Sequence, residues 1–287
     1  MWPREWWYET LQVERLWKEL GTRGEHTTVG VWDTGMDNRW GLIEGNRLVF
    51  KDYLDGGSNE PSDSHPEKHG SLVASIIGSK ADECGIAPRC QMRIARATGL
   101  KLLGDFRPFL PGEVFEDAQI INISHAFRVD DPDVSPAVTG FTEALAGTDK
   151  LIVAAMGNYS RAGRTPLTTV PASLPDVIGV NGTARGGGLY SGSINSAFVD
   201  LIAPGNEIAS PFSTTKQAGT SLSAAMITGV SCLVHSALVK RGRKPSSSTV
   251  ARILLSSTSP VPLSQKATHG VGPIDIDALI KNTNDEP

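Results

Sequence analysis

The segment GTSLSAAMITGVSCLVHSAL, residues 219–238, decides how the rest of the chain must be arranged. Nearly all of its side chains are small or apolar, and it has no clear polar face. A helix that is apolar all round is normally buried inside a domain, so the other elements are expected to surround it. Its first turn carries hydroxyl groups on Thr220, Ser221 and Ser223. Unpaired backbone N–H groups and a partial positive charge lie at that end of a helix.

These hydroxyl groups have two interpretations. Serine and threonine are ordinary helix N-caps, which would make the feature purely structural. A serine placed behind Gly219 could instead attack a carbonyl carbon, since the resulting oxyanion would face backbone donors. The choice depends on whether the chain also supplies a base and a carboxylate that orients the base.

Composition limits the classes of protein to which the chain can belong. With 287 residues, 39% of them hydrophobic, it can bury a large core, and a single α/β domain is expected. The net charge of −4 gives no electrostatic reason to expect nucleic acid or an anionic membrane as a partner. We find no apolar run approaching the length that crosses a bilayer.

The two ends of the chain differ from its centre. All six tryptophans fall within the first 40 residues, and residues 5–20 have the spacing of an amphipathic helix that ends at Gly21. We therefore expect a Trp-rich helical extension over residues 1–20, a main domain over 21–281 and a disordered tail over 282–287. The tryptophans either pack on the chain's own domain or dock a partner.

The expected location is the cytoplasm. The N-terminal sequence MWPREWW lacks the apolar core of a signal peptide, and three cysteines suit a reducing compartment. The alternative is the processed mature form of a secreted protein.

Apolar runs alternate with helical patterns along the main domain. Strands are predicted at 27–32, 91–97, 120–125, 151–156, 177–180 and 198–202, and helices at 69–78, 136–148 and 246–255. Residues 51–68 read as a surface loop. Continuous apolar strands that alternate with helices predict an α/β fold of three layers, α/β/α, with a mostly parallel central sheet.

Chemically useful side chains stand where these elements begin or end. Asp33 follows the first strand, His69 begins a helix beside a glycine, and Asn158 follows a strand and Gly157. Each has an ordinary structural explanation, as a turn aspartate, a surface histidine and an asparagine in a left-handed turn. In open α/β sheets, however, functional groups collect at the carboxyl ends of strands. Together with Ser221, the set supplies a nucleophile, a base and a carboxylate, with the Asn158 amide as an oxyanion donor.

A metal site is the competing interpretation. His65 and His69 are four residues apart with Glu67 between them, a spacing that can hold zinc on a helix. Pro66 argues against a continuous helix there, so no metal site is expected. If the two histidines did hold a metal for a metallopeptidase reaction, chelators would abolish the activity.

With these motifs the sequence resembles the subtilisin-like serine peptidases, the subtilases. Asp33-Thr34-Gly35, His69-Gly70-Ser71 and Gly219-Thr220-Ser221 match the three catalytic motifs of that family in order, and Gly157-Asn158 matches its oxyanion motif. The resemblance runs from about Gly21 to Leu279 and implies a subtilisin-like fold and a serine endopeptidase. It implies that Ser221 is the nucleophile, His69 the base and Asp33 its orienting acid. The oxyanion donors would be Asn158 and the Ser221 N–H.

The resemblance also implies how a substrate binds. A protein or peptide would lie as an added extended strand between two walls, formed by Ser124, His125 and Ala126 on one side and by Ala155, Met156 and Gly157 on the other. No cofactor is required. Structural calcium would have to use Asp52, Asp55 or Asp63, which are candidates by composition alone. A binding protein on the same fold, with a closed site, is the remaining alternative.

Overall fold

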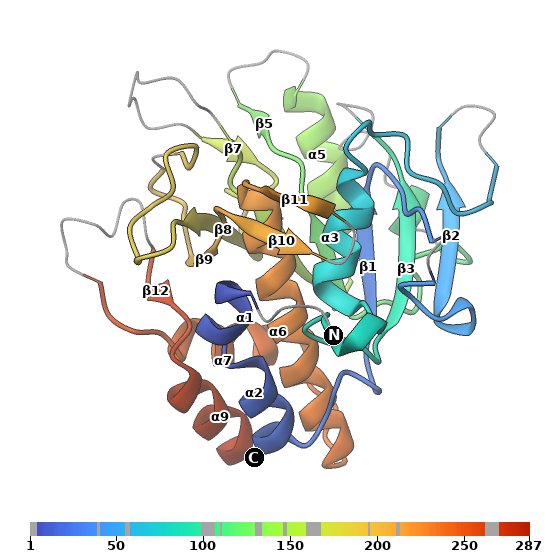
Figure 1. The fold of residues 1–287 in the computed structure, drawn as a ribbon. Coiled ribbons are helices and arrows are strands. Elements are labelled where there is room, and N and C mark those ends of the chain that lie inside the picture. The colour runs from blue at the N-terminus through green and yellow to red at the C-terminus, as the bar shows by residue number, and fades with distance from the viewer. Residues whose placement is uncertain are drawn as a thin grey trace.

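An eight-stranded sheet forms the centre of the protein in the computed structural model (Figure 1). The structure describes residues 5–38, 41–54, 58–98, 107–109, 111–129, 134–145, 148–158, 168–194, 196–210, 213–261 and 270–287. The sheet strands, in chain order, are β1 (Thr28–Asp33), β2 (Leu48–Asp52), β3 (Gln91–Arg96), β4 (Ile120–Ile123), β6 (Leu151–Ala155), β8 (Val177–Thr183), β9 (Leu201–Pro204) and β12 (Gly272–Pro273).

The strand order explains where a site can form. The order is β12-β9-β8-β6-β4-β1-β3-β2, and every neighbouring pair is parallel. This confirms the predicted mostly parallel sheet. After β1 the chain forms β2 and then β3 on one side of it, and β4 follows on its other side. Ligands of open α/β sheets bind at such a reversal, outside the carboxyl ends of the strands, and Asp33 is the last residue of β1.

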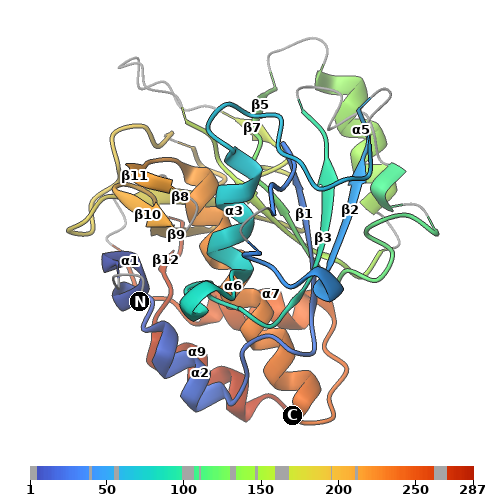
Figure 2. The same cartoon turned by 45° about the vertical axis from the view of Figure 1, so that its right-hand side comes forward.

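Helices cover both faces of the sheet (Figures 1 and 2). The helices are α1 (Trp6–Thr10), α2 (Val13–Leu20), α3 (His69–Gly78), α5 (Val134–Leu145), α6 (Thr220–Lys240), α7 (Ser247–Ser256) and α9 (Ile276–Asp285). Short 3₁₀ turns lie at Gly45–Arg47, Ala81–Glu83 and Arg107–Phe109. Two antiparallel strand pairs lie outside the central sheet. They are β5 (Phe127–Arg128) with β7 (Thr169–Val170), and β10 (Ile208–Ser210) with β11 (Ser213–Gln217). The arrangement is the expected three-layer α/β/α fold.

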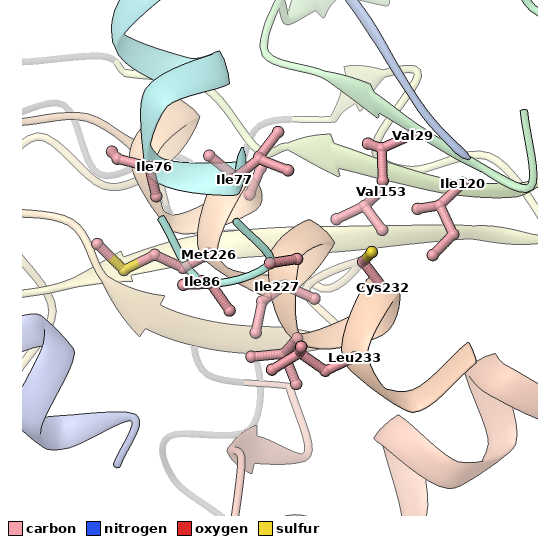
Figure 3. Close-up of a cluster of buried hydrophobic side chains, with 14 of the residues drawn as sticks. Val29, Ile76, Ile77, Ile86, Ile120, Val153, Met226, Ile227, Cys232 and Leu233 are labelled. Atoms are coloured by element: carbon pink, nitrogen blue, oxygen red, sulfur yellow. The ribbon is translucent and has the colours of Figure 1, made fainter. Parts of the chain in front are cut away.

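The hydrophobic core has two parts because side chains alternate along each strand. Val31 belongs to the cluster under α3 and α6, whereas Trp32 belongs to the cluster on the other face, which contains Phe141 of α5. Figure 3 shows part of the first cluster, in which side chains of α6, of α3 and of the sheet lie together.

Helix α6 is the buried element that the sequence predicts. Its residues from Thr220 to Leu238 are all buried. Contrary to our expectation from sequence, it is long and apolar enough to cross a membrane. However, 94% of its most apolar window is covered by the rest of the protein. The burial identifies it as the core helix of a folded domain.

The N-terminal segment is two helices rather than the single helix predicted for residues 5–20. The break falls at Gln12, whose φ of 46° is left-handed. The indole N–H groups of Trp6, Trp7 and Trp17 donate to backbone carbonyl oxygens of residues 207, 209 and 86. Trp7 and Trp17 are buried, so these two rings are committed to the chain's own core.

The C-terminal segment also differs from its prediction. Residues 282–285 are the last turn of α9 and not part of a disordered tail. Asp275 caps the helix by accepting from the Ala278 N–H at 3.0 Å, and Leu279 and Thr283 face the interior. The short apolar face of α9 packs beside α2 and α7, contacts that the local sequence pattern does not reveal.

Candidate active site

Asp33 ends β1 with its side chain fully buried. One carboxylate oxygen, Oδ1, accepts from the Thr34 N–H at 2.7 Å and lies 2.7 Å from Nδ1 of His69. Burial alone would raise the pKa of this carboxyl group. The charge of His69 and the hydrogen bond to it, with smaller contributions from His125 and the Thr34 N–H, outweigh burial and lower the pKa of Asp33 to about 2. Asp33 is therefore an anion at neutral pH.

His69 is the first residue of α3. The next residue, Gly70, has to be glycine because a Cβ there would lie 2.2 Å from the Gly35 carbonyl oxygen. This close approach presses the start of α3 against the loop that follows β1. Burial favours the neutral imidazole, but the charge and hydrogen bond of Asp33, aided by Asp63 and Glu67, raise the pKa of His69 above its usual value. The result is a stronger base, held by a buried carboxylate.

Asp63 joins the two segments that carry this pair. Its Oδ1 accepts from the Thr34 hydroxyl at 2.7 Å and the His65 N–H at 3.0 Å. Its Oδ2 accepts from the N–H and the hydroxyl of Ser71, at 2.8 and 2.7 Å. Sequence reasoning missed this role and named Asp63 only as a calcium candidate.

Asp52 and Asp63, the two calcium candidates that the structure describes, have carboxylate oxygens engaged by protein groups. All four bonds to Asp63 come from protein donors, and Asp52 is paired with Arg96 at 2.8 Å while accepting from the Leu54 N–H. Asp55 lies outside the described residues. Calcium prefers carboxylate and carbonyl oxygens that are free to coordinate it.

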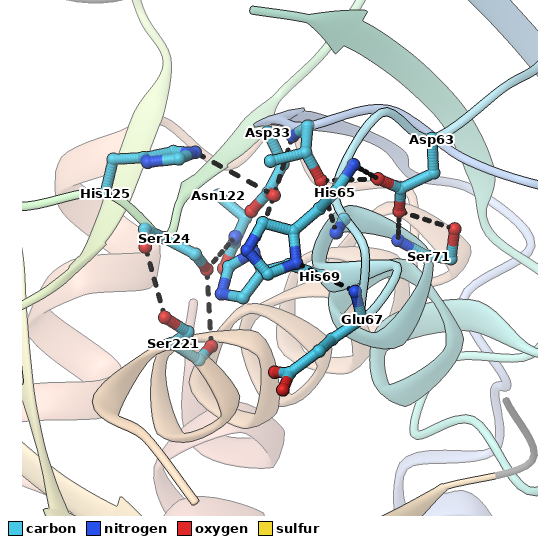
Figure 4. A network of polar contacts seen from close by, with 12 residues as sticks. Asp33, Asp63, His65, Glu67, His69, Ser71, Asn122, Ser124, His125 and Ser221 are labelled. Atoms are coloured by element: carbon cyan, nitrogen blue, oxygen red, sulfur yellow. Dashed lines mark hydrogen bonds and ion pairs between the residues drawn. The ribbon is translucent and has the colours of Figure 1, made fainter. Parts of the chain in front are cut away.

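Ser221 lies in the first turn of α6, close to the other candidate residues. Its Oγ donates to the Ser124 carbonyl oxygen at 3.1 Å, as Figure 4 shows, and the described residues contain no Ser221–His69 hydrogen bond. Ser221, His69 and Asn158 line one cavity of about 310 Å³. The cavity is also lined by Thr34, His65, Ser124, His125, Ala126 and Gly157.

The side-chain amide of Asn158 has a fixed direction. Its Oδ1 accepts from the Tyr190 hydroxyl at 2.7 Å, from the Thr220 N–H at 2.9 Å and from the Thr220 hydroxyl at 3.3 Å. With three donors on the oxygen, the NH₂ group is left to donate elsewhere. It lies beside Gly219, where a Cβ would sit 3.1 Å from Nδ2. Tyr190 was not recognised from sequence, because it lies 32 residues from Asn158.

The predicted substrate walls are only partly exposed to this cavity. Ser124, His125, Ala126 and Gly157 line it, but Ala155 and Met156 do not: they are 1% and 0% exposed. Their side chains enter the two core clusters because they alternate at the end of β6. Ala155 and Met156 therefore do not form the substrate wall expected of them in this structure.

The metal interpretation is not supported. His69 uses Nδ1 for Asp33, and His65 uses Nδ1 to accept from the Glu67 N–H at 3.2 Å. Within the described part of the chain, no three His, Cys, Asp or Glu side chains are grouped to hold a metal ion. The two rings lie 5.8 Å apart, centroid to centroid, and each has its Nδ1 in a hydrogen bond with another partner.

A buried aspartate paired with a histidine, and a serine at the start of the central helix, follow in this chain order on a parallel α/β sheet. This arrangement defines the class of subtilisin-like serine endopeptidases. The chain belongs to the subtilase family, whose model matches residues 24–272.

Individual relatives agree with this assignment. The Major intracellular serine protease of Bacillus subtilis is 27% identical over 270 residues, which are 90% of this chain and 83% of that protein. The structure of the prenylagaramide maturation protease PagA is 27% identical with a TM-score of 0.73, covering 96% of this chain and 99% of the other. The structure of MycP1 with its N-terminal propeptide removed has a TM-score of 0.77 at 22% identity, over 96% of both chains. This similarity shows that the two proteins share a fold. The chain is a serine endopeptidase.

Proposed function

We propose that Ser221, His69 and Asp33 form the catalytic triad of this endopeptidase and that Asn158 is its oxyanion donor. The observation that carries the proposal is the 2.7 Å contact between Asp33 and His69 at the edge of a cavity that Ser221 and Asn158 share. Nucleophilic serine needs an adjacent base, and the base needs a partner that fixes its orientation.

The reaction begins with a rotation of the Ser221 side chain. The hydroxyl leaves the Ser124 carbonyl oxygen and turns toward Nε2 of His69, which takes the proton as Oγ attacks the substrate carbonyl carbon. Asp33, already an anion, stabilises the imidazolium. His69 then gives the proton to the leaving amine, and water repeats the sequence on the acyl-enzyme.

The negative charge of the tetrahedral intermediate meets two donors. Asn158 offers its NH₂ group, whose direction is set by the three bonds to its oxygen. The Ser221 N–H lies in the first turn of α6, where backbone N–H groups have no helical partner. Both donors are in place before the charge develops.

We further propose that a protein or peptide substrate binds as an extended strand along residues 124–126. The support is that these residues follow β4 and line the cavity beside Ser221. A cytoplasmic location remains a proposal, supported by the intracellular relative from Bacillus subtilis. A partner bound at the N-terminal helices would contact Trp6 rather than Trp7 or Trp17, since Trp6 is half-buried and the other two are buried.

The proposal is tested by labelling with a fluorophosphonate probe. Wild-type protein is expected to be labelled, whereas Ser221→Ala is not and His69→Ala is labelled far more slowly. His26→Ala, at an exposed histidine before β1, serves as the matched control and should label like wild type. The labelling rate should rise with pH, because His69 acts as a base only when neutral. Its raised pKa places the midpoint above the ordinary value of 6.5.

The contrary results are equally specific. A folded wild-type protein that is not labelled would support the alternative of a binding protein on a peptidase fold. Labelling that persists in Ser221→Ala would place the nucleophile elsewhere.

A further inference from the structure

Two buried polar atoms beside the Asp33–His69 pair have no hydrogen-bond partner among the described residues. They are Oδ2 of Asp33 and Nε2 of His125. Nε2 of His125 lies 3.8 Å from the other oxygen of the same carboxylate, and Figure 4 shows the ring directed toward it. Buried polar groups are almost always paired. An unpaired donor beside an unpaired acceptor is therefore a feature that needs an explanation.

The backbone that carries His125 is held in place. The Asn122 side chain donates to the Ser124 hydroxyl at 2.8 Å, and the Ser124 carbonyl oxygen accepts from Ser221 at 3.1 Å. Asn122 is itself fixed by the Thr228 hydroxyl of α6 at 3.0 Å. The imidazole of His125 is thus placed by the same network that positions the nucleophile, and it lies 5.9 Å, centroid to centroid, from the ring of His69.

The charge state of His125 suits a donor rather than a second cation. Burial lowers the pKa of His125, and the nearby rings of His69 and His65 act in the same direction, against the attraction of Asp33. Among the residues that the structure describes, these three groups are the ionisable side chains whose charges act on His125. The ring is therefore neutral at neutral pH and carries one N–H. A neutral donor can hold Asp33 without opposing the positive charge that His69 acquires during the reaction.

We propose that His125 is a positioning residue of the catalytic reaction, whose Nε2–H donates to the carboxylate of Asp33 and holds Oδ1 toward His69. Nε2 lies 3.8 Å from Oδ1, so a movement of only about 1 Å brings that contact to hydrogen-bond distance. Asp33 would then lie between two imidazoles, one that reacts and one that does not. The inference rests on the proposed triad, and it assigns to His125 a role other than that of a substrate wall.

The test compares two substitutions of the same residue. His125→Leu removes the donor, whereas His125→Gln keeps an N–H near the position of Nε2. With a chromogenic peptide substrate, kcat of His125→Leu should fall about tenfold to a hundredfold with little change in KM, because a misplaced catalytic group loses rate. His125→Gln should recover most of that loss. His26→Leu, the same change at an exposed histidine, is the control.

A spectroscopic measurement separates positioning from a general loss of structure. The low-field proton resonance of the His69 Nδ1–H bonded to Asp33 is recorded in the Ser221→Ala background. The resonance should persist with His125→Gln and should broaden or move upfield with His125→Leu. If His125→Leu does not fold, His125→Asn replaces it, since its side chain is too short to reach Asp33.

The outcomes distinguish this inference from the proposed function. If Ser221-dependent labelling is present but both His125 variants keep the wild-type kcat, or alter only KM and substrate preference, His125 is a substrate wall and the inference is overturned. Equal losses of kcat in the two variants would also contradict it, because the donor would then be irrelevant. If wild-type protein shows no Ser221-dependent labelling, the triad itself is wrong.

Discussion

At the scale of single residues, the structure shows how a flexible amide becomes a directed donor. The oxygen of Asn158 is occupied by Tyr190 and by both donors of Thr220, so its NH₂ group can face only the other way. The pKa of Tyr190 is raised by burial to about 12. Tyr190 therefore remains a hydrogen-bond donor over the whole neutral range.

Tyr190→Phe should lower kcat by up to about tenfold, because one hydrogen bond contributes about 1 kcal/mol and Thr220 still holds the amide oxygen. The loss should be the same at pH 6 and pH 9, since Tyr190 does not ionise in that range. Tyr53→Phe is the control, because it removes a hydroxyl that bonds Glu113 away from the cavity. A Tyr190→Phe enzyme with unchanged kcat would show that Thr220 alone fixes Asn158.

At the scale of elements, the site depends on the docking of the start of α3 against the end of β1. Asp63 supplies the connection by bonding Thr34 on one side and Ser71 on the other. The Thr34 hydroxyl also accepts from the Gly70 N–H at 2.9 Å. The short distance between Asp33 and His69 is therefore a property of the loop and the helix together.

Asp63→Asn should loosen this junction. An asparagine keeps one acceptor oxygen, but its NH₂ group would face the two donors of Ser71. An unpaired buried donor costs about 1–3 kcal/mol, so the free energy of unfolding should fall by that amount. It is measured by urea denaturation in the Ser221→Ala background, which prevents autolysis. In the active background, the fluorophosphonate labelling rate should fall as well.

Asp176→Asn, at an exposed position on the loop before β8, is the control for that experiment and should change neither quantity. If Asp63→Asn lowered stability but left the labelling rate intact, Asp63 would hold the fold and not the catalytic pair.

At the scale of the whole molecule, α6 is the element around which the protein folds, and it carries a buried histidine. His235 is 7% exposed, and its Nδ1 lies 2.8 Å from the Thr27 hydroxyl. Burial lowers the pKa of His235 from 6.5 to about 4, outweighing the attraction of Asp149. The unfolded chain therefore binds this proton more readily than the folded one. The stability contributed by the neutral ring is complete above pH 6.5 and is lost as the pH falls toward 4.

This linkage predicts an acid-sensitive core. The free energy of unfolding should decrease by about 2 kcal/mol between pH 7 and pH 5 through His235 alone. His235→Asn, which can still bond Thr27 but does not titrate, should remove that part of the pH dependence. Urea denaturation of both proteins in the Ser221→Ala background measures the difference. Parallel pH curves for the two proteins would show that His235 is not the group responsible.

Agreement between sequence and structure is best where one segment carries its own signal. The apolar strands, the helix that begins at His69 and the buried helix that begins at Thr220 are all present. The sequence-based predictions fail where a contact with a distant segment determines the local structure. The left-handed Gln12 divides the N-terminal helix. Strand β2, paired with β3, extends through Asp52 into the segment predicted as a loop, and residues 282–285 stay helical because α9 packs on α2 and α7.

The sequence by itself determined the parallel three-layer fold, the burial of α6 and the order of Asp33, His69 and Ser221. These features follow from local periodicity and from motifs that lie within a few residues. Only the tertiary structure decided what surrounds each of them: His125 beside Asp33, Asp63 between Thr34 and Ser71, and Tyr190 on Asn158. It also decided that Ala155 and Met156 face the core rather than the cavity. The physical reason is that hydrogen-bond partners and burial depend on contacts between segments far apart in the chain, and no local pattern records those contacts.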